Sequence, residues 1–294
     1  MLVRTLRPAR PVDLALTLRP VRRGRSDPSM RVGPGEVWRA TRTPGGPVTT
    51  RVTAGAGELT MRAWGPGAEW ALDAFPALVG QDDDDSGFSP RHDVVAALRR
   101  RLRGLRICRT QAAMEALVPS ILEQKVIGLE ARLSYARLVR ALGEPAPGPN
   151  PLRLVVPPSP GVLARTPAHA FHRFGIERKR ADTVRVAASY AHRIEEAPTF
   201  ERLTSLPGIG PWTAAEVALV AVGDADAVSV GDYHLPNLVA YSLAGEPRAD
   251  DARMLELLEP YRGHRGRVVR LLEAGGRTAP RRGPRLPLNP IAHL

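Results

Sequence analysis

Residues Leu206 to Ala215 read LPGIGPWTAA and lie between two segments with helical spacing of apolar residues. Gly208 and Gly210 permit a connection so short that one helix ends and the next begins almost at once. Pro211 suits the first turn of the outgoing helix, because the N–H that proline lacks would have no intrahelical partner there. The stretch therefore predicts a tight hairpin between two helices.

A hairpin of this kind is suited to hold a phosphate group. The first backbone N–H groups of a helix have no intrahelical acceptor, so they point outward and attract an anion. Such a grip on a nucleic-acid backbone does not read base sequence. The alternative is an ordinary turn between helices that happens to contain two glycines, and the short motif alone does not decide between them.

The composition favours a nucleic-acid partner. The chain has 294 residues, is 43% hydrophobic and carries a formal net charge of +12. This length suggests about two domains with a sizeable core. All but two of the 42 basic residues are arginine, a bias that a GC-rich genome can also produce. Codon usage does not explain the excess of base over acid, so we expect a polyanionic partner, with nucleic acid favoured over a membrane surface.

Several classes of protein are excluded by simple counts. No apolar run approaches the ~18 residues that a membrane-spanning helix needs, and the Arg-rich N-terminus lacks the features of a secretory signal. Cys108 is the single cysteine. It cannot form an intramolecular disulfide, a Cys-based zinc site or a four-cysteine iron–sulfur cluster. These counts fit a protein of a reducing cytoplasm with no membrane association and no iron–sulfur cluster.

The first third of the chain shows strand-like alternation. Apolar and polar residues alternate at Leu14, Leu16 and Leu18 and again in residues 47–52 and 58–64, which is typical of half-buried strands. A helix is expected at 70–78. We predict an α+β protein in which residues 1–88 form a small antiparallel sheet domain with a flanking helix.

The segment 81–91, QDDDDSGFSPR, combines an acidic run with Ser, Gly and Pro. We interpret it as a solvated linker. A metal-binding acidic loop is the alternative, although four adjacent aspartates cannot all point at one ion.

The pattern becomes helical from His92 onward. Apolar residues recur at i, i+3 and i+4 with short connections, apart from a Pro-rich segment at 145–161. This spacing predicts an all-α domain over residues 89–278. Residues 279–294 are rich in Pro and Arg with little to bury, and we expect them to be a disordered basic tail.

A second feature follows the hairpin downstream. The stretch VSVGDYHLPN places Asp232 after an apolar segment and at the start of another helix. Judged alone, this aspartate would be a helix N-cap.

The order of these motifs resembles that of the helix-hairpin-helix DNA glycosylases, and within them the bacterial 3-methyladenine DNA glycosylase II type. LPGIGPWTA followed by VGDYHLP is similar to the hairpin and aspartate of the family. ILEQKVIGLEARLSYARLVRALG, GIERKRADTVRVAA and EPYRGHRGRVVRLL are similar to three further segments. The resemblance covers roughly residues 90 to 275, and the N-terminal sheet matches the extra domain of this branch more weakly.

The resemblance implies a DNA N-glycosylase of base excision repair that hydrolyses the bond to a flipped alkylated purine in double-stranded DNA. Asp232 would be catalytic, because a carboxylate beside C1′ stabilises an oxocarbenium-like transition state. Trp212 would be a wall of the base pocket, where an indole stacks well on a cationic purine; a core position is the alternative. Strand-cutting members carry a lysine nucleophile at the place of Trp212, so a monofunctional enzyme is implied.

The resemblance also implies DNA contacts in two places. The hairpin would hold the backbone, and the Gln-Lys pair would fill the gap left by the flipped nucleotide; a solvated helix face is the alternative for the latter. The residues concerned are Gly208, Ile209, Gly210, Thr213, Gln124 and Lys125.

Members of the family often hold a monovalent cation in the hairpin. By position, the main-chain carbonyls of Thr204, Leu206 and Ile209 would bind Na⁺ or K⁺ here. The resemblance implies that no cofactor is required and that the protein is a monomer of the bacterial cytoplasm.

Two positions depart from the family and leave the substrate range open. Glu216 stands where relatives have an aromatic residue, and Gly231 stands where some have an acid before the aspartate. Two other functions remain possible on this sequence: a non-catalytic damaged-DNA-binding protein, or a bifunctional glycosylase/lyase for oxidised bases.

Overall fold

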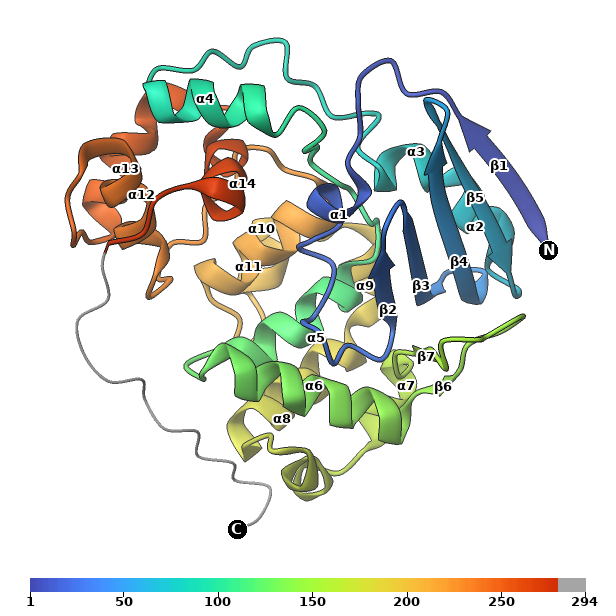
Figure 1. Cartoon of the computed structure of the whole chain (residues 1–294). Helices are drawn as coiled ribbons and strands as arrows, with labels where there is room; N and C mark the ends of the chain where they lie inside the picture. The colour runs from blue at the N-terminus through green and yellow to red at the C-terminus, as the bar shows by residue number, and fades with distance from the viewer. Residues whose placement is uncertain (280–294) are drawn as a thin grey trace.

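The computed structural model describes residues 1–279, and the basic tail predicted from residue 279 lies, except for Ala279, outside the described residues. An antiparallel sheet comes first in the chain and a large helical part follows (Figure 1). The predicted α+β class with an N-terminal sheet is confirmed.

The sheet has five strands in the order β1-β5-β4-β3-β2, and every neighbouring pair is antiparallel. Val48, Val52 and Met61 are almost fully buried on one face, as the alternation in these segments predicts. The helices α2 and α3 follow the sheet where one helix was expected. The elements are β1 (Leu2–Leu6), β2 (Met30–Gly33), β3 (Glu36–Thr43), β4 (Gly46–Gly55), β5 (Glu58–Trp64), α2 (Ala68–Asp73) and α3 (Phe75–Leu78).

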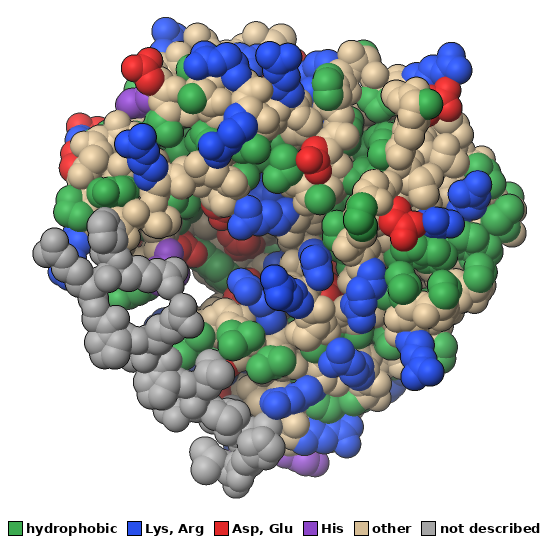
Figure 2. All heavy atoms as spheres, in the orientation of Figure 1, with side chains coloured by type: hydrophobic (Ala, Val, Ile, Leu, Met, Phe, Trp, Pro, Cys, Tyr) green, Lys and Arg blue, Asp and Glu red, His purple; other side chains and the backbone are tan. Residues whose placement is uncertain are grey.

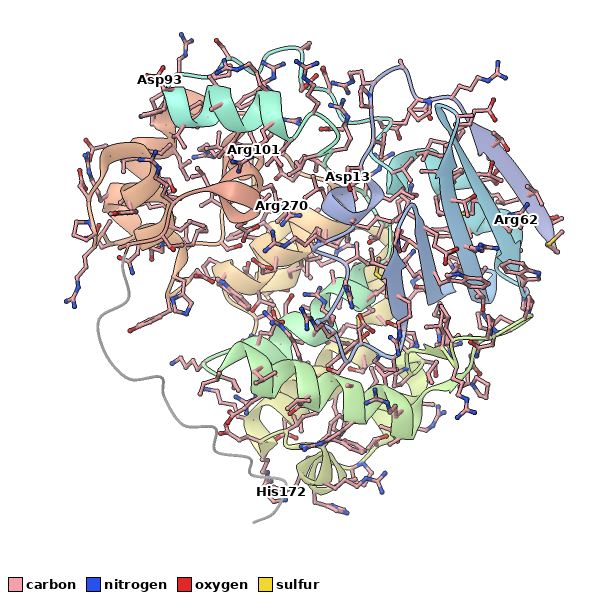
Figure 3. All side chains as sticks on the ribbon, viewed as in Figure 1. Asp13, Arg62, Asp93, Arg101, His172 and Arg270 are labelled. Atoms are coloured by element: carbon pink, nitrogen blue, oxygen red, sulfur yellow. The ribbon has the colours of Figure 1, made fainter. Side chains whose placement is uncertain are left out.

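The strand expected at Leu14 to Leu18 is wrong. This segment is the short helix α1 (Leu14–Thr17), and the side chain of Asp13, labelled in Figure 3, caps it by accepting the N–H of Leu16 at 3.0 Å. Leu14 and Leu18 are both buried. A spacing of four residues places two side chains on one helix face, so the same leucines fit a helical turn as well as a strand.

The helical part contains α4 to α14, with one small addition. The Pro-rich segment forms a two-stranded ribbon, which the helical pattern did not predict. Between residues 1 and 279, no helix has both the length and the apolar character needed to cross a bilayer. The elements are α4 (Asp93–Arg101), α5 (Ala113–Glu123), α6 (Gly128–Leu142), β6 (Glu144–Pro145), β7 (Val155–Val156), α7 (Pro160–Arg165), η1 (Ala168–Phe174), α8 (Arg178–Ser189), α9 (Ala191–Glu196), α10 (Phe200–Thr204), α11 (Pro211–Val217), η2 (Ala218–Val222), α12 (Leu235–Ala244), α13 (Asp251–Leu258), η3 (Glu259–Tyr261) and α14 (Arg265–Gly275).

Two larger apolar cores organise the described chain. The first joins the sheet to α5, α6, α8 and α11. The second joins α4 to α12, α13 and α14 and includes Phe88. The apolar core of the sheet thus continues into the helices, and the domain boundary expected after residue 88 stays a prediction.

The acidic run is only in part a solvated linker, because Asp82 and Asp84 are exposed whereas Asp83 and Asp85 are not. Asp83 is buried and forms a two-armed ion pair with the buried guanidinium of Arg267 on α14, at 2.6 and 2.9 Å. Asp85 forms ion pairs with Arg10, Arg99 and Arg106. These ion pairs connect the acidic run to the N-terminal segment through Arg10, to α4 through Arg99 and to α14 through Arg267.

Candidate active site

The hairpin forms where the sequence predicts it. α10 ends at Thr204, α11 begins at Pro211, and the N–H of buried Ile209 donates to the carbonyl of Leu206 at 3.1 Å. Four N–H groups of this segment have no acceptor within residues 1–279: those of Gly208, Gly210, Trp212 and Thr213. These groups are available to an external anion, as expected for a phosphate grip.

The two hairpin glycines have different surroundings. Gly208 has φ +84°, and a Cβ placed there would lie 2.3 Å from Oγ1 of Thr183 on α8. Gly210 has extended backbone, with φ −103°, and a Cβ there would meet nothing within 4 Å. The close approach of the hairpin to α8 therefore requires Gly208, whereas the space beside Gly210 is open.

Gln124 is held against the hairpin. It follows the end of α5, and its Nε2 donates to the carbonyl of Gly208 and to Oγ1 of Thr213, both at 2.9 Å. Its own carbonyl accepts a hydrogen bond from Arg180 at 3.1 Å. The next residue, Lys125, is exposed and has φ +54°. The structure thus brings Gln124 to the hairpin, and the gap-filling role of the pair stays a prediction.

Trp212 and Asp232 are brought together by the fold. The indole Nε1 of Trp212 donates to Oδ2 of Asp232 at 3.2 Å, and both side chains are half-buried. Oδ1 of Asp232 accepts the N–H groups of His234 and Leu235 at 2.7 and 2.8 Å. The N-cap residue of α12 is His234, not Asp232. Asp232 instead holds the backbone N–H groups at the start of α12 with one oxygen and contacts α11 with the other, so this structural role and the catalytic role are compatible.

A second contact joins the same two segments. Glu216, one turn after Trp212 on α11, accepts a hydrogen bond at Oε1 from the hydroxyl of Ser229. The N–H of Asp232 in turn donates to the carbonyl of Ser229 at 3.2 Å. The sequence singles out Glu216 as a departure from the family but carries no signal for Ser229, because the bond spans a loop of unpredicted shape.

A hollow lies in the face shown in Figure 2, beside α11, with acidic side chains in its wall and Lys and Arg around it. Two cavities of the described chain lie elsewhere. One of about 610 Å³ is lined by η1 and α8 and includes His172, labelled in Figure 3. Another of about 350 Å³ is lined by Tyr190, which precedes α9, by residues of α9 and α10 such as Arg202, and by Leu206 of the hairpin. Neither includes Trp212 or Asp232.

The donor set proposed for a monovalent cation is consistent with the backbone. The carbonyls of Thr204 and Ile209 accept no hydrogen bond from the described residues, and that of Leu206 accepts one. Carbonyl oxygens suit hard cations, so the site stays a prediction that the geometry permits. Among residues 1–279 no group of three or more His, Cys, Asp or Glu side chains could hold a metal ion.

Comparison with known proteins gives consistent relatives. No family model matches the chain. It is 32% identical over 177 residues to proteins described as "Probable bifunctional transcriptional activator/DNA repair enzyme AlkA" from two strains of Mycobacterium tuberculosis. The match covers 56% of this chain and 33% of the relative, so the chain spans about a third of the length of the curated relatives that it matches.

Solved structures match nearly the whole chain. The 3-methyladenine DNA-glycosylase from Archaeoglobus fulgidus superposes with a TM-score of 0.77 at 17% identity, covering 92% of this chain and 97% of that one. MBOgg1 in complex with a low-affinity DNA ligand gives 0.73 at 15% identity, covering 92% and 93%. The 8-oxoguanine glycosylase/lyase of Clostridium acetobutylicum gives 0.71 at 12% identity, covering 92% and 95%. The chain therefore has the fold of the helix-hairpin-helix DNA glycosylases, and the resemblance to them inferred from its hairpin is confirmed.

Proposed function

We propose that the chain is a DNA glycosylase of base excision repair that hydrolyses the N-glycosidic bond of flipped alkylated purines. The observation that carries this proposal is the 3.2 Å hydrogen bond between Trp212 and Asp232. It brings an aromatic surface and a carboxylate together directly beside a hairpin with free backbone N–H groups. The AlkA names of the Mycobacterium tuberculosis relatives support the alkylated-base class.

The proposed reaction uses each part of this arrangement. The hairpin N–H groups hold a phosphate of double-stranded DNA, and the face of Trp212 stacks on the extruded base. As the bond to the base breaks, positive charge develops on the sugar, and Asp232 stabilises that charge in the transition state. A water molecule then attacks C1′. An alkylated purine that already carries a positive charge is an activated leaving group and needs little further assistance.

We infer hydrolysis without strand cleavage. A lyase step needs an amine that forms a Schiff base with the sugar. The only lysines are Lys125, in the exposed loop after α5, and Lys179, near the start of α8. The resemblance to the family implies that Trp212 stands where lyase members carry their lysine. We also propose that the protein acts as a monomer and that the hairpin carbonyls bind Na⁺ or K⁺.

The test is a base-release assay with purified protein on methylated double-stranded DNA. Released bases are separated by chromatography, with 3-methyladenine, 7-methylguanine and hypoxanthine as standards. We expect release of 3-methyladenine with the DNA strand left intact. Binding to methylated DNA without release of any base would instead favour a non-catalytic damage-binding protein.

A further inference from the structure

Glu216 is held so that half of its carboxyl group is free. Oε1 accepts the hydroxyl of Ser229, while Oε2 has no hydrogen-bond partner within the described chain. The side chain is half-buried, and Oε2 is not fully enclosed. The side chain projects from α11 one turn beyond Trp212, and residues four apart share one helix face. A base stacked on Trp212 would therefore lie near a free carboxyl oxygen.

Charged side chains from several elements surround Glu216. It interacts electrostatically with Glu273 of α14, Glu123 of α5 and Arg23 of the segment after α1. Glu123 lies 4.0 Å from Arg23, whose side chain is nine-tenths buried, and Glu273 is paired with Arg270 of the same helix at 2.7 Å. Glu216 itself forms no ion pair with any described residue. Its carboxylate is therefore available to a cationic ligand.

We propose that Glu216 is a specificity-determining residue of the base pocket, whose free carboxylate oxygen pairs with the positive charge of an extruded alkylated purine. This inference rests on the proposed function. An aromatic residue at this position would recognise a cationic base by stacking. Here the carboxylate of Glu216 would recognise it by charge. A neutral purine gains no such interaction, so the pocket discriminates by charge.

The interaction depends on pH in a defined direction. Burial raises the pKa of Glu216 to about 7, with Glu273 and Glu123 acting in the same direction and Ser229 and Arg23 opposing it. Below this pH the carboxyl group is protonated and loses its attraction for a cation. The preference for cationic over neutral bases should therefore rise as the pH increases from 6 to 8.

The experiment compares two bases released by the full chain. One substrate is methylated DNA that yields 3-methyladenine, which is cationic as a nucleoside, and the other is a duplex containing neutral hypoxanthine. We expect Glu216→Gln to lower the ratio of the two kcat/KM values about tenfold and to abolish its dependence on pH. The matched control is Glu256→Gln, which removes an exposed carboxylate of α13 and should leave the ratio unchanged.

The outcomes separate this inference from the function on which it rests. An unchanged ratio in Glu216→Gln, or equal losses on both bases, would overturn the role of Glu216 alone. The pH profile of the unmodified protein needs no variant, and a ratio that is flat between pH 6 and 8 would also overturn that role. If the unmodified protein releases neither base, the proposed function itself is wrong and the inference falls with it.

Discussion

Gly208 on the hairpin and Thr183 on α8 are packed so closely that a Cβ on the glycine would lie 2.3 Å from the threonine hydroxyl. With its φ of +84°, this glycine fixes how the hairpin is seated on the protein. Gly210, two residues later, has open space where a side chain would be. Substitutions at these two glycines therefore distinguish the contribution of the hairpin to protein stability from its contribution to DNA binding.

We expect Gly208→Ala to lower the free energy of unfolding by about 1–3 kcal/mol, because strain at positive φ adds to overpacking. Gly210→Ala should change it by less than about 0.5 kcal/mol yet weaken DNA binding, since the added methyl group faces the proposed phosphate. Urea unfolding and fluorescence anisotropy measure the two effects. We expect Gly210→Ala to lose affinity equally for DNA duplexes of unrelated sequence. A loss confined to one DNA sequence would contradict binding through the DNA backbone.

Asp232→Asn should retain the fold and lose base release. An amide oxygen can still accept the N–H groups of His234 and Leu235, so the contact with the start of α12 survives, but the negative charge beside the sugar is lost. We expect release to fall at least about a hundredfold on hypoxanthine, and less on 3-methyladenine. Asp250→Asn is the matched control, because Asp250 also accepts a backbone N–H at the start of a helix, that of Arg253 on α13. Near-normal release of hypoxanthine by Asp232→Asn would exclude the catalytic role.

Borohydride should trap no covalent complex between the protein and damaged DNA. Reduction by borohydride captures a Schiff base, which requires an amine at the sugar. The reaction product is expected to be an intact strand with an abasic site that breaks only on addition of alkali, as gel electrophoresis would show. A trapped band that disappears in Lys125→Ala or Lys179→Ala would establish a lyase and refute hydrolysis.

The ion pair of Asp83 and Arg267 should matter for stability because it is almost fully buried. Removing one partner leaves an uncompensated buried charge, so Asp83→Ala should lower the free energy of unfolding by about 3–5 kcal/mol. The exposed pair of Glu259 and Arg262 provides the control, and Glu259→Ala should cost about 0–1 kcal/mol. Denaturant unfolding measures both. Similar small losses would show that the acidic run does not fasten α14.

The sequence predicts well those features that depend on residues close together in the chain. The hairpin depends on two glycines and a proline that are neighbours in the chain, and the contact of Asp232 with the start of α12 involves residues next to it. The bond from Gln124 to Gly208 and the pair of Asp83 and Arg267 join residues 84 and 184 positions apart. No spacing rule foresees them. Asp83 and Asp85 look solvated in the sequence, because their arginine partners are distant in the chain.

The two apolar cores meet at the candidate active site. Trp212 is carried by α11, whose Ala214 and Val217 belong to the core of the sheet, whereas Asp232 leads into α12, whose Leu235 belongs to the other core. A separation of the cores by about 1 Å would break the hydrogen bond between indole and carboxylate. Core substitutions that loosen the packing between the two apolar cores, even far from DNA, should therefore lower activity. They would do so without changing any residue of the candidate active site.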